Sequence, residues 1–130
     1  MIQSPQSIRV ARAGEQAEAA IAWRYEERGW VVELSSPAFE TVVARESDAF
    51  EALCRIRRQL EPDGWRVGVA GALPGVWPSG MARDQGGGLT VYRLEPGELA
   101  PYVDTFSPVD PATVTTVALQ EAEADRVWGL

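Results

Sequence analysis

The sequence of 130 residues contains no histidine, no lysine and no asparagine, and all twelve of its basic residues are arginine. Without histidine there is no imidazole to act as a general base or metal ligand, and without lysine there is no Schiff base. Hydrolase triads that use histidine and zinc sites with Cys and His ligands are therefore not expected. Because the codons for Lys and Asn are rich in A and T, their absence indicates a very GC-rich, bacterial genome.

Cysteine and long apolar runs are also scarce. The single Cys54 cannot form an internal disulfide, and no apolar run approaches the roughly 20 residues that span a bilayer. Residues Met1 to Ala13 lack the charged start, apolar run and cleavage site of a signal peptide. We therefore expect a cytoplasmic protein that is not inserted in a membrane.

The composition predicts one folded domain over residues 1–130. An apolar fraction of 45% with five tryptophans is too high for a disordered chain. Residues 1–14, where Gln, Ser and Pro are frequent, are expected to be a loosely ordered start.

Acidic residues are concentrated in the last third of the chain. The net charge is −7, and the segment from Glu95 to Leu130 holds seven acids and one base, Arg126, which leaves −1 for everything before it. Nucleic acid is not an expected partner, because phosphate backbones are bound by clustered basic side chains. The charge favours a basic partner protein, although an acidic surface that merely keeps the chain soluble would give the same composition.

The first part of the sequence has the alternation of β-strands. Apolar residues at every second position predict strands around Ile21 to Tyr25, Trp30 to Leu34 and Phe39 to Arg45, with a short strand over Ser7 to Ala11. Turn residues separate these runs, so we expect antiparallel hairpins.

Two helices are predicted in the rest of the chain. Asp48 followed by Glu51 is typical of a capping box, and apolar residues then recur at helical spacing until Pro62. Thr115 or Thr116 is expected to cap a last helix, whose apolar stripe is Val117, Ala124, Val127 and Trp128.

Three further strands are predicted over 65–69, 89–94 and 102–106. The order strands, helix, strands, helix predicts an α+β fold, with a largely antiparallel sheet of about six strands and two helices packed on one face.

The stretch from Leu73 to Leu94 is the most unusual part of the sequence. It holds two prolines and five glycines between strand-like runs, and a connection of this length in a compact domain is typically functional or disordered. The candidate ligand- or partner-binding residues lie here: Trp77, Ser79, Met81, Arg83, Asp84 and Tyr92.

Each feature of this stretch has a structural alternative. The glycines 86–88 precede a strand instead of a helix, so they favour a close re-entry into the sheet over a phosphate loop. Ser79 is expected to cap a helical turn. Arg83 either clamps an anion in a pocket floored by Trp77 or ties the loop to a carboxylate at the core edge. Trp77 itself either plugs the core or anchors a partner.

No catalytic residue, metal or cofactor is predicted. Ser79 lies outside a Gly-x-Ser-x-Gly elbow, Cys54 lies in the middle of a helix as structural thiols do, and the carboxylates lack calcium-loop spacing. Catalysis by Asp84 with Arg83 and Tyr92 is the enzymatic alternative.

The segment from Trp77 to Gly88, with Gly64-Trp65 before it and Tyr92 after it, resembles a motif of small bacterial proteins whose function is unknown. The match covers about thirty residues. This resemblance implies that the loop is a defining feature, and it implies no reaction, ligand or partner.

These observations support three hypotheses. The first is a small cytoplasmic binding protein, such as an immunity protein or inhibitor, that meets a basic partner protein. The second is a small-molecule-binding protein or accessory biosynthetic enzyme with a pocket formed by residues 74–88. The third is a structural subunit of a larger assembly.

Overall fold

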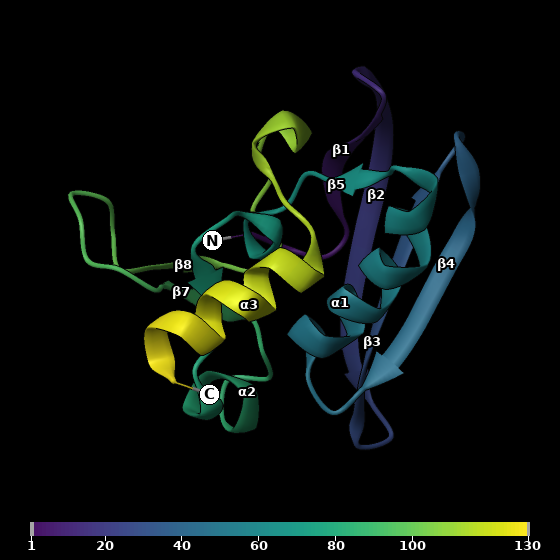
Figure 1. The fold of residues 1–130 in the computed structure, drawn as a ribbon. Coiled ribbons are helices and arrows are strands. Elements are labelled where there is room, and N and C mark those ends of the chain that lie inside the picture. The colour runs from purple at the N-terminus through teal and green to yellow at the C-terminus, as the bar shows by residue number, and fades with distance from the viewer. Residues whose placement is uncertain (1, 130) are drawn as a thin grey trace.

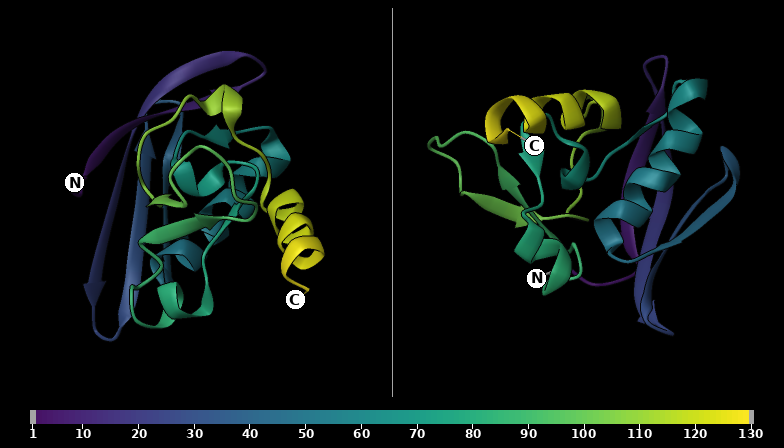
Figure 2. Two further views of the ribbon diagram at one scale, coloured as in Figure 1. Left: turned by 90° about the vertical axis from the view of Figure 1, so that its left-hand side faces the viewer. Right: turned by 60° about the horizontal axis from the view of Figure 1, so that its bottom comes forward.

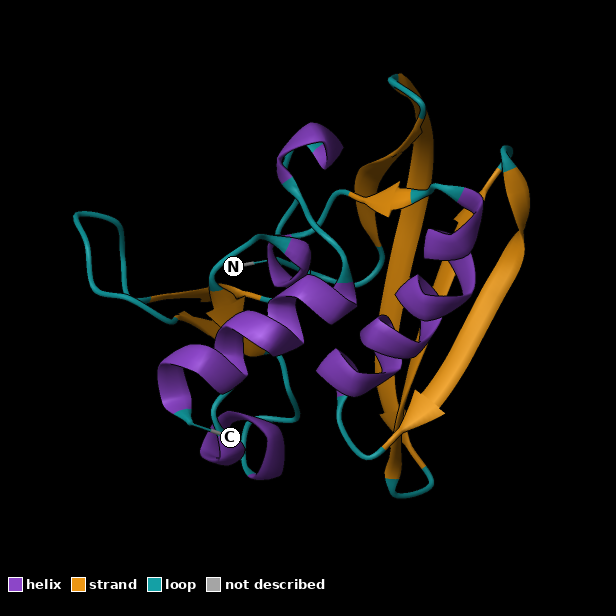
Figure 3. Ribbon diagram, in the orientation of Figure 1, coloured by secondary structure: helices purple, strands orange, loops and turns teal. Residues whose placement is uncertain are grey.

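The computed structural model describes residues 2–129 and contains two antiparallel sheets (Figures 1 and 3). The strands of the first follow the order β4-β3-β2-β1-β5, and those of the second the order β6-β7-β8. Their bounds are β1 Gln6–Arg12, β2 Glu15–Glu26, β3 Gly29–Ser36, β4 Phe39–Glu46, β5 Arg66–Val67, β6 Val76–Trp77, β7 Thr90–Arg93 and β8 Tyr102–Asp104. The helices are α1 Ala49–Leu60, α2 Gly80–Asp84 and α3 Val117–Trp128, with 3-10 turns at Glu61–Asp63, Ala70–Ala72 and Pro111–Thr113. The predicted α+β class is confirmed, whereas a single six-stranded sheet is not found.

The first four strands form the predicted succession of hairpins. Their register aligns Ile8 with Ala19 and Ile21 with Leu34, so one face of the sheet is apolar and buried. The start of the chain is more regular than expected, because β1 spans seven residues and lies between β2 and β5. Pairing on both edges holds it in place.

Helix α1 packs on that apolar face and is buried on two sides. Asp48 caps it as predicted, with its Oδ1 accepting a hydrogen bond of 2.8 Å from the Glu51 N–H. The apolar residues at helical spacing, Ala49, Leu53, Ile56 and Leu60, belong to the core of the large sheet. Phe50 and Cys54 belong to a second core under the small sheet. Figure 2 shows α1 and α3 on the same side of the large sheet.

The predicted sheet is divided because the chain leaves it after β5. The Gly68 N–H still bonds to the Arg9 carbonyl at 2.9 Å, but Val69 then bridges to Pro108, and a 3-10 turn follows. Strand β6 lies inside the predicted long loop and pairs with β7. A strand of two residues has no periodicity to recognise, so the sequence pattern could not indicate it.

Helix α3 begins as predicted, with the Thr116 Oγ1 accepting from the Leu119 N–H at 3.3 Å. Val117 and Ala124 are buried as expected. The prediction for Trp128 is wrong, because it lies in the last turn and its exposed fraction is 37%. Gln120 occupies a buried position on this helix instead.

A buried arginine joins α3 to α1. Arg57 has an exposed fraction of 1%, and it donates to the Gln120 Oε1 at 2.6 Å and to the Thr115 carbonyl at 2.7 Å. The Gln120 amide donates in turn to the carbonyls of Gly71 and Leu73, both at 2.8 Å. This network holds α3 against α1 and the turn at Ala70–Ala72.

No helix within residues 2–129 is both long and apolar enough to cross a membrane.

Candidate functional site

The predicted loop folds into a short capped helix. The Ser79 Oγ accepts a hydrogen bond of 3.0 Å from the Ala82 N–H, so Ser79 is the N-cap of α2. The predicted helical turn is therefore confirmed, and the hydroxyl of Ser79 is used within the loop.

Arg83 ties this loop to the start of α1. Its Nη1 lies 3.2 Å from the Asp48 Oδ2 and 3.3 Å from the Glu51 Oε2. Its guanidinium also lies over the rings of Phe50 and Trp77, at 5.1 Å and 5.6 Å from their centroids. Of the two roles considered for Arg83, the geometry matches the tie to a carboxylate at the core edge.

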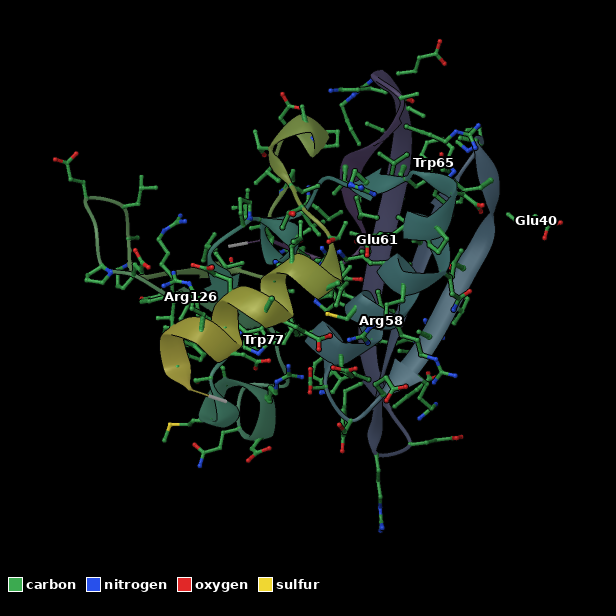
Figure 4. All side chains as sticks on the ribbon, in the orientation of Figure 1. Glu40, Arg58, Glu61, Trp65, Trp77 and Arg126 are labelled. Atoms are coloured by element: carbon green, nitrogen blue, oxygen red, sulfur yellow. The ribbon has the colours of Figure 1, made fainter. Side chains whose placement is uncertain are left out.

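Trp77 packs in the second core, under the small sheet. Its exposed fraction is 9%, and its ring meets that of Phe50 edge-on at 5.0 Å. Figure 4 shows it in the region behind α3, close to α2. Trp77 and Arg83 therefore come together, as predicted, but in a packed cluster.

The glycines after α2 permit a close approach to α1. Gly87 and Gly88 have positive φ angles of 65° and 72°, and the Gly87 carbonyl accepts from the Ala49 N–H at 2.7 Å. A Cβ on Gly88 would lie 2.6 Å from the Asp48 Oδ1. The N-terminus of α1 is thus capped by the protein's own groups, which agrees with the structural alternative for the glycines.

The remaining candidate residues are exposed and lie on different elements. Met81 and Asp84 are on α2, where Met81 has an exposed fraction of 68%. Tyr92 is on β7 with an exposed fraction of 37%, and its ring lies 5.9 Å from that of Tyr102 on β8.

Tyr102 was not among the predicted site residues, although the alternation Tyr102-Val103-Asp104 is a visible strand pattern. The loop between β7 and β8 projects from the body of the protein (Figure 1) and carries Leu99, whose exposed fraction is 67%. The β7–β8 hairpin therefore carries two exposed tyrosines on its strands and an exposed leucine in its loop.

Several acidic residues of the last third are paired with arginine. Arg126 contacts Glu95 at 3.0 Å and Glu123 at 2.5 Å, and Arg58 of α1 pairs with Glu121. The guanidinium of Arg126 holds the pKa of Glu123 below its usual range. Arg126 belongs to α3, and its side chain donates a hydrogen bond to Glu95 at the base of the β7–β8 loop (Figure 4).

The other four acidic residues of this part, Glu98, Asp104, Asp110 and Asp125, take part in none of the ion pairs found among residues 2–129, although Asp110 accepts hydrogen bonds from Gln16 and the Ala112 N–H. Their charge is therefore available to an external cation.

A groove lies elsewhere, on the face of the large sheet opposite α1. It has a volume of about 900 Å³ and is open to solvent. Gly68 lets the segment 109–111, which forms part of the lining, pass close beside β5, because a Cβ on Gly68 would lie 2.5 Å from the Val109 carbonyl oxygen. The lining mixes polar and apolar side chains. The polar ones include Ser7, Arg9, Gln16, Glu18, Ser35, Thr41 and Asp110, and the apolar ones include Ile8, Ala20, Pro37, Pro108, Val109 and Pro111.

The single cysteine of the chain, Cys54, is buried. Burial raises the pKa of the Cys54 thiol to about 12, so it stays protonated at neutral pH. Within residues 2–129 there is no group of three or more Cys, Asp or Glu side chains placed to hold a metal ion.

Comparison with known proteins does not assign the chain to a family. No family model matches the chain, and no curated protein matches it.

Proposed function

We propose that this chain is a non-catalytic binding protein of the bacterial cytoplasm, an immunity protein or inhibitor, that contacts a basic partner protein through the β7–β8 hairpin. The observation that carries the proposal is the exposure of three large apolar side chains on this one hairpin. The exposed fractions of Tyr92, Leu99 and Tyr102 are 37%, 67% and 58%.

The chemistry of this hairpin suits a protein interface. Tyrosine is enriched at interfaces because its ring buries a large area while its hydroxyl still bonds to water or a partner. Glu98 and Asp104 lie close to these rings in the sequence and supply negative charge that no arginine of the described residues pairs with. A basic partner would be attracted by the net charge of −7 and held by the apolar contacts.

Affinity purification from the cells that carry the gene tests this proposal. The tagged chain is compared with a Tyr92→Ser, Tyr102→Ser double variant and with Tyr25→Ser, a control at another exposed tyrosine on β2. We expect one basic protein in stoichiometric amount with the wild type and the control, and its loss in the double variant and at high salt. Equal recovery with all three chains, or no stoichiometric protein, would contradict the proposal.

A second candidate function, the binding of a small molecule, is supported by the groove on the large sheet instead of by residues 74–88. Its volume of about 900 Å³ lies in the range of ligand sites, and it offers both charges through Arg9 and Glu18. Native mass spectrometry of the chain purified from its own cells tests this function. A bound mass that is lost in a Ser7→Trp variant, which fills the groove, would support it, and an unliganded wild-type mass would remove it.

A further inference from the structure

The outward face of the small sheet places two tyrosines beside a carboxylate. The register pairs Tyr92 with Tyr102 and Thr90 with Asp104. Side chains alternate along a strand, so these four lie on one face, while Val91 and Val103 on the other face pack in the second core. Asp104 thus lies beside Tyr102 on the same face, two residues along the strand.

The two tyrosine rings are tilted relative to each other and are not stacked. Their centroids are 5.9 Å apart and their planes are inclined by 54°. In contrast, the stacked pair Trp23 and Phe106 has a centroid distance of 4.4 Å and an interplanar angle of 13°. The exposed Tyr92 and Tyr102 therefore offer ring surface to a planar group from outside.

The negative charge at this face is not neutralised by the chain itself. Asp104 belongs to none of the ion pairs found in the described part of the chain. The aromatic pair Tyr25 and Trp30 differs in this respect, because the carboxylates beside it are already paired. Glu26 follows Tyr25 in the sequence and pairs with Arg24 and Arg45, and Glu46 lies opposite Trp30 and pairs with Arg55. Of these two aromatic pairs, the one on the small sheet has a free carboxylate.

We propose that Tyr92, Tyr102 and Asp104 form a binding site for a guanidinium group, supplied by an arginine side chain of the partner protein. This inference rests on the proposed function and names the chemistry of its central contact. A guanidinium is planar, so it stacks on a tyrosine ring, and its N–H groups donate to a carboxylate in the same plane.

The chain already uses the stacking half of this arrangement internally. The guanidinium of Arg12 lies 4.6 Å from the centroid of the Trp65 ring, and that of Arg83 lies over Phe50. At the proposed site the rings and the carboxylate are present, and the arginine comes from outside.

A titration followed by two-dimensional NMR tests the site without any partner protein. The probe is Nα-acetyl-arginine amide, and the control probe is Nα-acetyl-citrulline amide, which has the same shape without the charge. We expect saturable shifts of the Tyr92, Tyr102 and Asp104 signals with the arginine probe and much smaller shifts with citrulline. Tyr102→Leu and Asp104→Asn should each weaken binding about two- to fivefold, and Tyr25→Leu should leave it unchanged.

Equal shifts with both probes, or no shift at these three residues, would overturn the proposed site. Because these variants change exposed residues, their spectra away from the hairpin should match the wild type, which establishes that they fold. If the NMR titration is negative but the purification still recovers a partner that depends on Tyr92 and Tyr102, only the guanidinium site is disproved. If the titration is positive but the purification recovers no partner, only the proposed function is disproved.

Discussion

At Gly88 the chain passes so close to the start of α1 that a side chain has no room. A Cβ there would lie 2.6 Å from the Asp48 Oδ1 and 2.7 Å from the Phe50 nitrogen, and φ is 72°. This contact places α2 and Arg83 against α1, so the geometry of the loop depends on it.

We predict that Gly88→Ala lowers the free energy of unfolding by about 2 kcal/mol or more, since it combines a positive φ with a steric clash. Gly80→Ala is the matched control in the same loop, where nothing lies within 4 Å of the added Cβ. It should leave stability unchanged or raise it by up to about 1 kcal/mol. Urea denaturation of both variants checks this, and equal effects would contradict it.

Cys54 should make stability depend on pH in the alkaline range. Burial raises the pKa of its thiol to about 12 in the folded chain, while the unfolded chain ionises near its ordinary value of about 8.5. Between these values the unfolded state loses the proton and the folded state keeps it. Stability is therefore fully present below the lower pKa and falls as the pH rises.

We predict that between pH 8 and pH 10 the wild type loses about 2 kcal/mol more stability than a Cys54→Ala variant, in which this thiol is absent. Urea denaturation at the two pH values measures the difference. All other titratable groups are the same in the two chains, so parallel losses of stability in both would contradict the prediction.

At the scale of elements, α3 is held by a polar network in addition to the apolar contacts of Val117 and Ala124. Gln120 accepts from Arg57 and donates to the carbonyls of Gly71 and Leu73. Each of these partners would be left unpaired in a buried place if the amide were removed.

We predict that Gln120→Ala destabilises the fold by about 2 to 4 kcal/mol, because several buried polar groups lose a partner. Amide hydrogen exchange should show the loss of protection first in α3. Gln85→Ala, at an exposed position after α2, is the control and should change stability by less than about 0.5 kcal/mol. A mild effect at Gln120 would mean that apolar packing alone holds α3.

The elements that the sequence predicted are those specified by local patterns. Alternation gave the hairpins of β1 to β4, the Asp48 cap gave α1, and Ser79 and Thr116 gave the starts of α2 and α3. Each of these signals depends on residues within one turn or one strand.

The features that the sequence could not predict depend on contacts between segments that are far apart in the chain. Arg57 is charged and would ordinarily be assigned to the surface, yet Gln120, which lies 63 positions later, allows it to be buried. The choice between the two roles of Arg83 likewise required knowing that Asp48 lies beside it. Tyr102 became a candidate when the second core showed which face of the hairpin points outward.

At the scale of the whole molecule, the large sheet ends in a long free edge. Strand β4 pairs with β3 on one side, and its other side carries no further strand in the described part of the chain. Glu40, Arg45 and Glu46 lie along this strand, and charges on an edge strand oppose pairing with a second copy.

We therefore predict that the isolated chain is a monomer. Light scattering after gel filtration should give a mass near 14.2 kDa at micromolar concentration. A stable multiple of that mass would instead favour the hypothesis of a structural subunit.

The most direct test of the central claim, that the outward face of the β7–β8 hairpin meets a protein, is photocrosslinking inside the cells that carry the gene. A photoreactive benzoylphenylalanine is placed at position 92 or 102, and at position 25 as the control. We expect a crosslink to one basic protein from positions 92 and 102 and none from position 25. Crosslinking from position 25 alone, or from none of the three positions, would contradict it.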